Sequence, residues 1–153
     1  VKSKRESSTW RINNWIELTN KLIAKKYDVV LIGGKADADF IDNIINKSDK
    51  NRLKSYAGRL NVIDSAALIK IAKLVISVDS GPMHLTYALN TKLIALFSAR
   101  DYAEKWYPPT NRGIVLRYDI KCSPCFLDEC PINNECINNI AVEEVVDAIS
   151  KYI

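Results

Sequence analysis

Short apolar runs of strand length alternate along this chain with segments in which apolar residues recur at every third or fourth position. Three of the runs lie at residues 27–32, 74–78 and 92–97. Runs of this kind, nearly continuous in apolar character, are typical of strands that are covered on both faces. Strands that alternate with helices form βαβ units, so the sequence predicts an α/β fold with a Rossmann-like parallel sheet and helices on both faces.

The apolar pattern also sets the expected bounds of the elements. We expect helices at 12–26, 37–45, about 65–72, 82–89 and 142–153, and strands at 27–32, 55–58, 74–78, 92–97 and 114–117. Asp64 or Ser65 is expected to cap the third helix, and Asn138 or Asn139 the last one.

Length and composition indicate one globular domain at 1–153. The chain has 153 residues, of which 48% are hydrophobic and 26% charged, values close to the globular average. No apolar run reaches the ~18 residues of a membrane span. The net charge of +4 is too small and too dispersed for a nucleic-acid surface but suits an anionic small ligand. Val1 is not an initiator Met and no apolar signal core follows it, which indicates an internal cut in a longer protein.

The segment from Asp79 to His84 concentrates the residues that point to a function. It follows a predicted buried strand, and ligands of such sheets bind beyond the carboxyl ends of the strands. Gly81 allows close approach of a ligand to the backbone, and Pro82 is tolerated in the first turn of the helix that follows. The N–H groups and the dipole of this first turn favour a phosphate.

Two side chains of the segment, Asp79 and His84, are compatible with more than one role. The carboxylate of Asp79 would repel a phosphate placed directly on it, so we expect it to orient the turn or to accept hydrogen bonds from sugar hydroxyls. His84, the only histidine, lies in the first turn. A capping turn without a ligand and a histidine with a purely structural role remain open alternatives at this point.

The same residues resemble a known family. The run from Asp79 to Leu85, the strand at 94–97 and the later cysteines at Cys122, Cys125, Cys130 and Cys136 are similar to the carboxy-terminal half of glycosyltransferase family 9, the heptosyltransferase family. Weaker similarities at the first helix and first strand extend the resemblance over nearly the whole chain. The resemblance implies one half of a GT-B type enzyme, whose amino-terminal acceptor half is absent from this chain.

The resemblance also implies a function and a set of site residues. It implies a donor-binding domain for a nucleotide sugar, with ADP-heptose as donor and the lipopolysaccharide core or a related glycan as acceptor. It places the enzyme in the cytoplasm, at the inner face of the bacterial inner membrane, where it is compatible with peripheral membrane association. No cofactor and no metal for the donor are expected. The donor-binding residues carried over are Ser3, Lys4, Leu60, Asp79, Ser80, Gly81, Met83 and His84.

Departures from the family pattern leave parts of this assignment open. Ser8 stands where the family has a basic residue, so Lys4 or Arg5 is expected to supply that charge. Asp37 and Asp39 are both candidates for the acidic residue that binds the ribose. The catalytic carboxylate of such enzymes lies in the amino-terminal half, so we expect no catalytic residue here and no turnover by the isolated chain. A stand-alone nucleotide-binding or regulatory domain without catalysis is the alternative.

All four cysteines lie in one short segment, at Cys122, Cys125, Cys130 and Cys136. Thiolates at such spacing suit a structural zinc or iron–sulfur site, and two disulfides would staple the same loop. Free thiols are the third reading, and in a cytosolic protein they need no special explanation. The spacing does not decide between a metal site, disulfides and free thiols, and it assigns no residue as a metal ligand.

Overall fold

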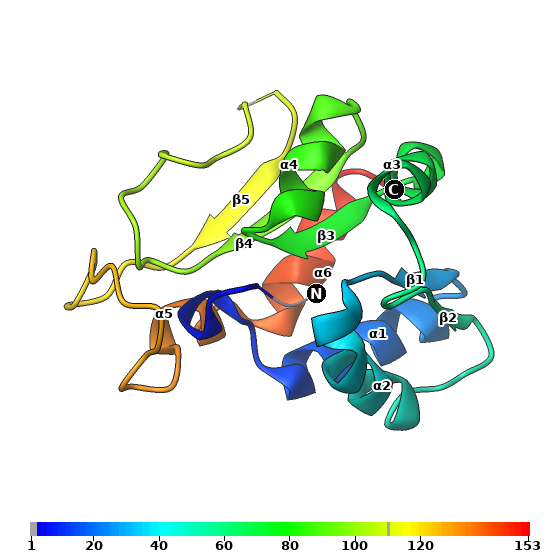
Figure 1. Ribbon diagram of the computed structural model, residues 1–153, viewed down its shortest axis with the longest axis horizontal. Coiled ribbons are helices and arrows are strands. Elements are labelled where there is room, and N and C mark those ends of the chain that lie inside the picture. The colour runs from blue at the N-terminus through cyan, green and yellow to red at the C-terminus, as the bar shows by residue number, and fades with distance from the viewer. Residues whose placement is uncertain (1–2, 110) are drawn as a thin grey trace.

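The computed structural model describes residues 3–109 and 111–153 as an α/β structure in which helices flank parallel strands (Figure 1). Short 3-10 helices, η1 and η2, precede α1 and α2. The elements in chain order are η1 (Glu6–Ser8), α1 (Ile12–Ala24), β1 (Val29–Leu31), η2 (Lys35–Asp37), α2 (Ala38–Asn46), β2 (Leu53–Ser55), α3 (Val62–Ile71), β3 (Val75–Val78), α4 (Gly81–Ala88), β4 (Leu93–Phe97), β5 (Ile114–Arg117), α5 (Glu135–Asn138) and α6 (Val142–Ser150).

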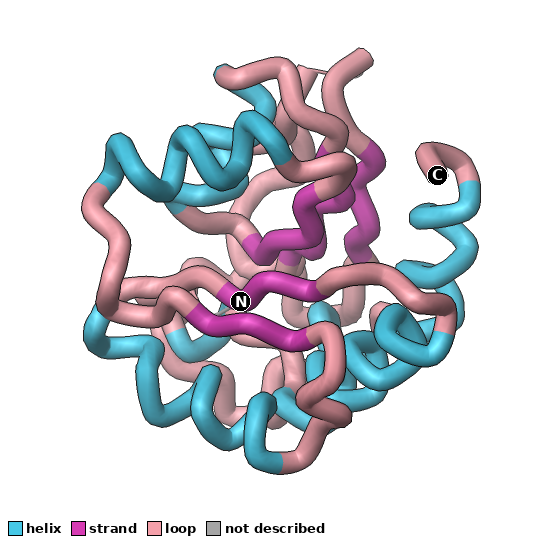
Figure 2. Tube along the Cα trace, turned by 90° about the vertical axis from the view of Figure 1, so that its right-hand side faces the viewer, coloured by secondary structure: helices cyan, strands magenta, loops and turns pink. Residues whose placement is uncertain are grey.

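The strands form two parallel ladders, where the sequence predicted a single sheet. β1 pairs with β2 from Val29–Leu53 to Leu31–Ser55, and β3, β4 and β5 form a second ladder in that order. Figure 2 shows the two ladders as separate groups of strands. The predicted parallel pairing is therefore confirmed, and the carboxyl ends of β3 and β4 lie next to each other at one edge of the sheet.

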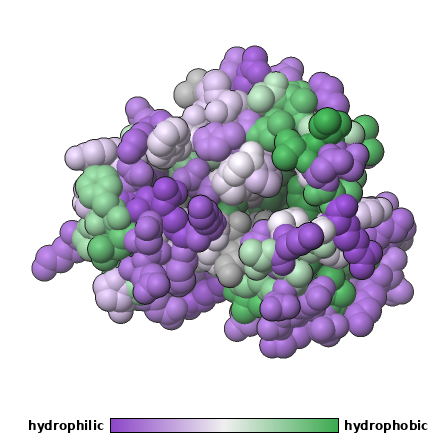
Figure 3. All heavy atoms as spheres, viewed as in Figure 1, coloured by the Kyte–Doolittle hydropathy of each residue, from purple (hydrophilic) through white to green (hydrophobic). Residues whose placement is uncertain are grey.

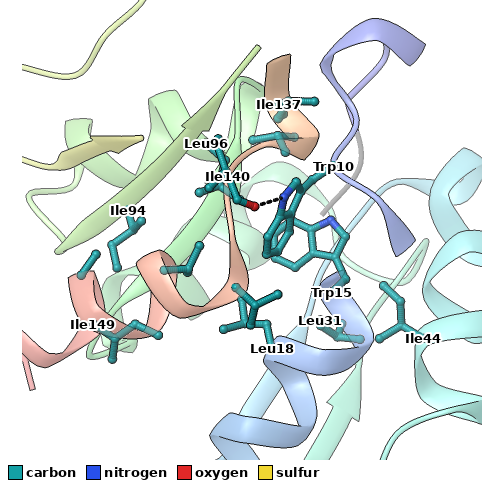
Figure 4. Packing of buried hydrophobic residues seen from close by; sticks show 14 of the residues in the cluster. Trp10, Trp15, Leu18, Leu31, Ile44, Ile94, Leu96, Ile137, Ile140 and Ile149 are labelled. Atoms are coloured by element: carbon teal, nitrogen blue, oxygen red, sulfur yellow. Dashed lines mark hydrogen bonds between the residues drawn. The ribbon is translucent and has the colours of Figure 1, made fainter. Parts of the chain in front are cut away.

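Strand β4 lies at the centre of the packing because both of its faces are covered. Ile94 and Leu96 belong to the larger core cluster, which α1 and α6 complete, whereas Leu93, Ala95 and Phe97 pack with Met83 of α4 on the opposite face. This alternation follows from the two-residue period of a strand. Trp10 and Trp15 fill the larger cluster near Ile140 and Leu18 (Figure 4).

The structure corrects several predicted bounds. β2 ends at Ser55, because a turn with Gly58 at a φ of +67° follows where we predicted the strand. Asn61 caps α3, since its side chain accepts a hydrogen bond from the backbone N–H of Asp64, so the predicted caps at Asp64 and Ser65 are wrong.

The last predicted helix is confirmed as α6, although it ends at Ser150, and a short helix that was not predicted, α5, precedes it. α5 ends at Asn138, and α6 starts after Ala141, whose backbone N–H donates to Glu144 at 2.8 Å. The predicted caps Asn138 and Asn139 are therefore also wrong.

In the view of Figure 3 most of the surface is hydrophilic, and one of several apolar areas lies over α3. Val62, Ile63 and Ile71 of this helix are 74%, 79% and 79% exposed. Among the described residues, no helix combines the length and the apolar character that crossing a membrane requires.

Candidate functional site

The candidate site begins where β3 passes into α4. Val78 ends the strand, Gly81 starts the helix, and Asp79 and Ser80 connect them. The backbone of Ser80 is extended and its carbonyl oxygen accepts the N–H groups of Met83 at 3.0 Å and His84 at 3.2 Å. Its hydroxyl group donates to the carbonyl oxygen of Val78 at 3.0 Å. The turn is therefore fixed by its own hydrogen bonds, and the positive end of the α4 dipole lies beside it.

Gly81 leaves open space at the start of α4. The residue is exposed, and a Cβ atom added to it would meet no other atom within 4 Å. A ligand can therefore approach the backbone of the first turn closely, which is what phosphate binding at a helix N-terminus requires.

Met83, predicted to face the donor, points away from this space. Its side chain is fully buried against β4, and its N–H group already donates to Ser80. Both groups through which we expected Met83 to contact a ligand are thus occupied within the protein. The buried side chain of Met83 packs α4 against the sheet, and its N–H group stabilises the turn through Ser80.

Asp79 and His84 face each other across the turn. Oδ1 of Asp79 lies 3.7 Å from Nε2 of His84, and Nδ1 of the same imidazole lies 3.1 Å from the hydroxyl oxygen of Tyr87. The Asp79 side chain is only 22% exposed. Burial raises the pKa of Asp79, and the nearby charges of His84 and Arg5 offset part of that effect. The pair therefore places a partly buried carboxyl and an imidazole at the entrance to α4.

The segment that precedes α1 crosses the carboxyl ends of the strands. The family resemblance assigns two residues of this segment, Ser3 and Lys4, to the donor site. Ser3 is buried, and its hydroxyl group donates to the carbonyl oxygen of Asp79 at 3.4 Å. Lys4 is exposed. The guanidinium of Arg5 forms an ion pair with Asp128 at 3.1 Å. The structure thus brings Ser3 and Asp79 together although they are 76 positions apart in the sequence.

The residues expected near the nucleoside lie on the other ladder. Leu60 is half-buried between β2 and α3. Asp37 accepts a hydrogen bond from the backbone N–H of Gly34 at 2.8 Å, whereas Asp39 is exposed. Gly58, before Leu60, donates to the carbonyl oxygen of Gly33 at 2.9 Å. These loops therefore belong to the β1–β2 ladder, and among the described residues no hydrogen bond joins them directly to the Asp79 turn.

A second group of charged residues follows β4, and sequence reasoning assigned it no role beyond its place after a strand. Arg100 donates from Nε to the carbonyl oxygen of Leu127 at 2.9 Å and from Nη2 to that of Phe126 at 2.8 Å. Oδ1 of Asp101 accepts from Nζ of Lys105 at 3.0 Å. Arg100 and Asp101 also contribute to the electrostatic surroundings of Asp79, so this group belongs to the same edge of the sheet.

The four cysteines are free thiols in the structure. Cys136 is buried, its Sγ accepts the N–H of Ala99 at 3.3 Å, and burial raises the pKa of the thiol. Within residues 3–109 and 111–153, no group of three or more His, Cys, Asp and Glu side chains is arranged to hold a metal ion. Hydrogen bonds contribute to holding the loop, including those from Asn134 Nδ2 to the carbonyl oxygen and to Oε1 of Glu6 at 2.8 and 2.9 Å.

Comparison with known proteins identifies the family to which this arrangement belongs. The family model described as glycosyltransferase family 9 (heptosyltransferase) matches residues 2–135. The chain belongs to glycosyltransferase family 9. This result confirms the resemblance stated from the Asp79–Leu85 run and the cysteine spacing.

Relatives in this family include lipopolysaccharide heptosyltransferases. The chain is 31% identical to lipopolysaccharide heptosyltransferase 3 of Escherichia coli over 147 residues, which cover 94% of this chain and 43% of the relative. It is 32% identical to lipopolysaccharide heptosyltransferase 2 of E. coli K12 over 113 residues, or 71% of this chain and 32% of the relative. The chain thus spans less than half the length of these two enzymes.

Solved structures of heptosyltransferases share the fold. ADP-heptose lipopolysaccharide heptosyltransferase II of E. coli superposes with a TM-score of 0.80 at 23% identity, over 97% of this chain and 43% of that one. The E. coli heptosyltransferase WaaC in complex with ADP-2-deoxy-2-fluoro heptose gives a TM-score of 0.72 at 19% identity, over 99% and 41%. The Rossmann-like α/β fold predicted from the sequence is therefore that of one part of these GT-B enzymes.

Proposed function

We propose that this chain is the donor-binding domain of a glycosyltransferase that transfers heptose from ADP-heptose to the lipopolysaccharide core or a related glycan. The turn from Asp79 to Gly81 carries the proposal, because it joins an open helix N-terminus to a carboxyl–imidazole pair at the carboxyl edge of the sheet. Membership of glycosyltransferase family 9 and the solved complex of WaaC with an ADP-heptose analogue support it.

The residues of the chain suggest how the donor is held. The diphosphate lies at the start of α4, where the helix dipole and the exposed backbone of Gly81 favour negative charge. Lys4, exposed in the segment that crosses the site, adds a positive charge. Leu60, on the β1–β2 side, borders the adenosine. The same dipole stabilises the charge that develops on the departing ADP during transfer.

The acceptor and the catalytic base belong to the other half of the GT-B architecture in this proposal. Transfer to a hydroxyl group needs a base toward that hydroxyl, and we assign that role to no residue of this chain. The acceptor is a glycolipid, which places the reaction at the cytoplasmic face of the bacterial inner membrane. The isolated chain should therefore bind donor or ADP without catalysing transfer.

Calorimetric titration of the chain with ADP, UDP and GDP tests this proposal. We expect saturable binding that is selective for ADP and is weakened by Asp79→Ala and by His84→Ala. The matched control is Lys50→Ala, which removes an exposed charge from the loop before β2 and should leave the affinity unchanged. Selective binding of UDP or GDP would exclude ADP-heptose as the donor. No binding of any of the three would contradict a donor site in this chain.

A further inference from the structure

Trp106 is an exposed indole in the segment between β4 and β5. Its exposed fraction is 47%, whereas Trp10 and Trp15 are 0% and 3% exposed in the core. Tryptophan is usually largely buried, because its large apolar surface is costly to hydrate. The position of Trp106 is therefore not explained by core packing.

The indole is nevertheless held in place by charged neighbours. Burial alone would raise the pKa of Asp101, but hydrogen bonds from Nζ of Lys105 and from the backbone N–H of Tyr102 outweigh burial and lower it. The ammonium group of Lys105 also lies 5.5 Å from the centroid of the Trp106 ring, within the range of a cation–π contact. An aromatic ring fixed in this way loses little conformational entropy when a ligand packs on it.

His84 connects this ring to the turn proposed for the diphosphate. The ring centroids of His84 and Trp106 are 6.2 Å apart with the planes at 79°. Nε2 of His84 also lies 3.7 Å from Oδ1 of Asp79. The imidazole therefore contacts both the carboxyl of the turn and the indole, which brings Trp106 within one ring of the turn proposed for the diphosphate.

The order of the strands indicates which part of a nucleotide sugar this ring would meet. β4 follows β3 in its ladder, and Trp106 lies in the segment after β4. The loops assigned to the nucleoside, around Leu60, belong to the other ladder, which Figure 1 places on the opposite side of β3. With the diphosphate at the end of β3, the nucleoside extends toward β2 and the glycosyl group toward Trp106.

We propose that Trp106 forms a wall of the donor's glycosyl subsite and packs against the C–H face of a pyranose ring carried on a nucleoside diphosphate. This inference rests on the proposed function and adds to it a residue that distinguishes a nucleotide sugar from the bare nucleotide. One face of a pyranose is rich in C–H groups, and displacing water between that face and an indole is favourable. Asp101 and Lys105 act as positioning residues, because they reach the sugar only through the orientation of the indole.

Calorimetric titration of the full 153-residue chain with ADP and with ADP-heptose tests this role. An aromatic contact contributes about 0.5–1.5 kcal/mol beyond area burial, so Trp106→Ala should lower the affinity for ADP-heptose about two- to thirteenfold. The affinity for ADP should change less than about twofold. Trp106→Phe should retain most of the affinity for ADP-heptose. The matched control is Tyr102→Ala, which removes a 63% exposed aromatic side chain from the same segment and should change neither affinity.

Indole fluorescence gives a second measurement that a purely structural role would not affect. Trp10 and Trp15 are buried and Trp106 is exposed, so ADP-heptose should shift the emission of the wild-type chain more than ADP does. This difference should disappear in Trp106→Phe, whose thermal unfolding should match that of the wild type.

The possible results distinguish the role of Trp106 from the proposed function of the chain. Binding of ADP and ADP-heptose to every variant with an unchanged ratio of affinities would overturn the role of Trp106 and leave the donor site intact. Equal weakening of both ligands by Trp106→Ala would also overturn it, because the ring would then serve the nucleotide part. Failure of the wild-type chain to bind either ligand would overturn the proposed function and this inference together.

Discussion

The indole N–H of Trp10 donates a hydrogen bond to the carbonyl oxygen of Ile140 at 3.1 Å (Figure 4). The contact joins residues 130 positions apart and is buried. The Trp10 ring also packs edge-on against Trp15, with centroids 5.0 Å apart. Trp10 therefore connects two parts of the chain. One is the segment that places Ser3 and Lys4 at the candidate site, and the other is the pair of helices at the end of the chain.

Trp10→Phe should destabilise the chain by about 2–4 kcal/mol, because it leaves the buried Ile140 carbonyl without its partner and opens a cavity. The measurement is the free energy of unfolding from urea titration followed by circular dichroism. Trp106→Phe is the control, since it makes the same chemical change at an exposed position and should stay within about 0.5 kcal/mol of the wild type. Equal effects of the two substitutions would contradict a structural role for the Trp10 contact.

Gly81→Ala should weaken ADP binding at least about tenfold without loss of stability. A Cβ at this position meets no protein atom within 4 Å, so the added methyl group would occupy only the space that we assign to the phosphates. Replacing a helical glycine should change stability by at most about 1 kcal/mol, in the stabilising direction. Calorimetry and thermal unfolding measure the two quantities on the same protein.

Gly113→Ala should have the opposite effects on stability and on ADP binding. A Cβ at Gly113 would approach Pro108 Cγ to 3.1 Å and the Leu93 side chain to 3.3 Å. This variant should therefore lose stability while its affinity for ADP remains unchanged. If Gly81→Ala bound ADP as tightly as the wild type, the diphosphate would not lie at the start of α4.

The periodicity of the sequence predicted the central strands well, because core burial alone determines them. β4 lies within a residue of its predicted start and ends at the predicted Phe97, and β5 matches 114–117. The start of α3 was missed because Val62 and Ile63 are apolar yet exposed, so they carry no helical stripe that faces the core. The element bounds that were predicted wrongly depend on local hydrogen bonds, such as the cap at Asn61. Other caps of similar strength compete with these bonds.

The candidate site was predictable where it depends on one continuous segment and not where it depends on tertiary contacts. The run from Asp79 to His84 could be read from residue types that follow a strand. The burial of Met83 was missed, because a first-turn residue can face either the ligand or the sheet. The proximity of His84 and Trp106 depends on the path of the chain after β4, and no spacing rule encodes it.

The stability of the chain should depend on pH through Asp79. Burial raises its pKa in the folded state above the ordinary value of 3.8, so the folded state binds the proton more tightly than the unfolded state does. The free energy of unfolding therefore falls as the pH rises from 3.8 through the folded-state pKa, and then levels off.

Asp79→Asn removes this dependence, because the amide stays neutral. The stability of the variant relative to wild type should increase with pH over that window. Urea titrations of both proteins from pH 3.5 to 7 measure the difference, in which the contributions of other carboxyl groups cancel to a first approximation. A difference that stays flat, or that decreases with pH, would show that burial does not govern this carboxyl.

Arg100 should control access to the thiol of Cys136. Its guanidinium holds the carbonyl oxygens of Phe126 and Leu127, and Phe126 N–H donates to the Arg100 carbonyl oxygen at 2.8 Å. The loop that leads to Cys136 is thus attached to the end of β4 through Arg100, and the thiol of Cys136 accepts the N–H of Ala99, the neighbour of Arg100. Removing the Arg100 side chain leaves two carbonyl groups without their charged donor, which should loosen the loop by about 1–3 kcal/mol.

Arg100→Ala should therefore speed alkylation of Cys136 by iodoacetamide about five- to a hundredfold, as measured by mass spectrometry of each cysteine-containing peptide. Cys122 is already exposed, so its rate should hardly change and serves as an internal reference. The matched control is Arg112→Ala, which removes a guanidinium bonded to the carbonyl oxygen of Tyr87 on α4, away from the loop. If Cys136 reacted at the same rate in Arg100→Ala and in wild type, the hydrogen bonds that Glu6 accepts from Cys130 and Asn134 would be sufficient to hold the loop closed.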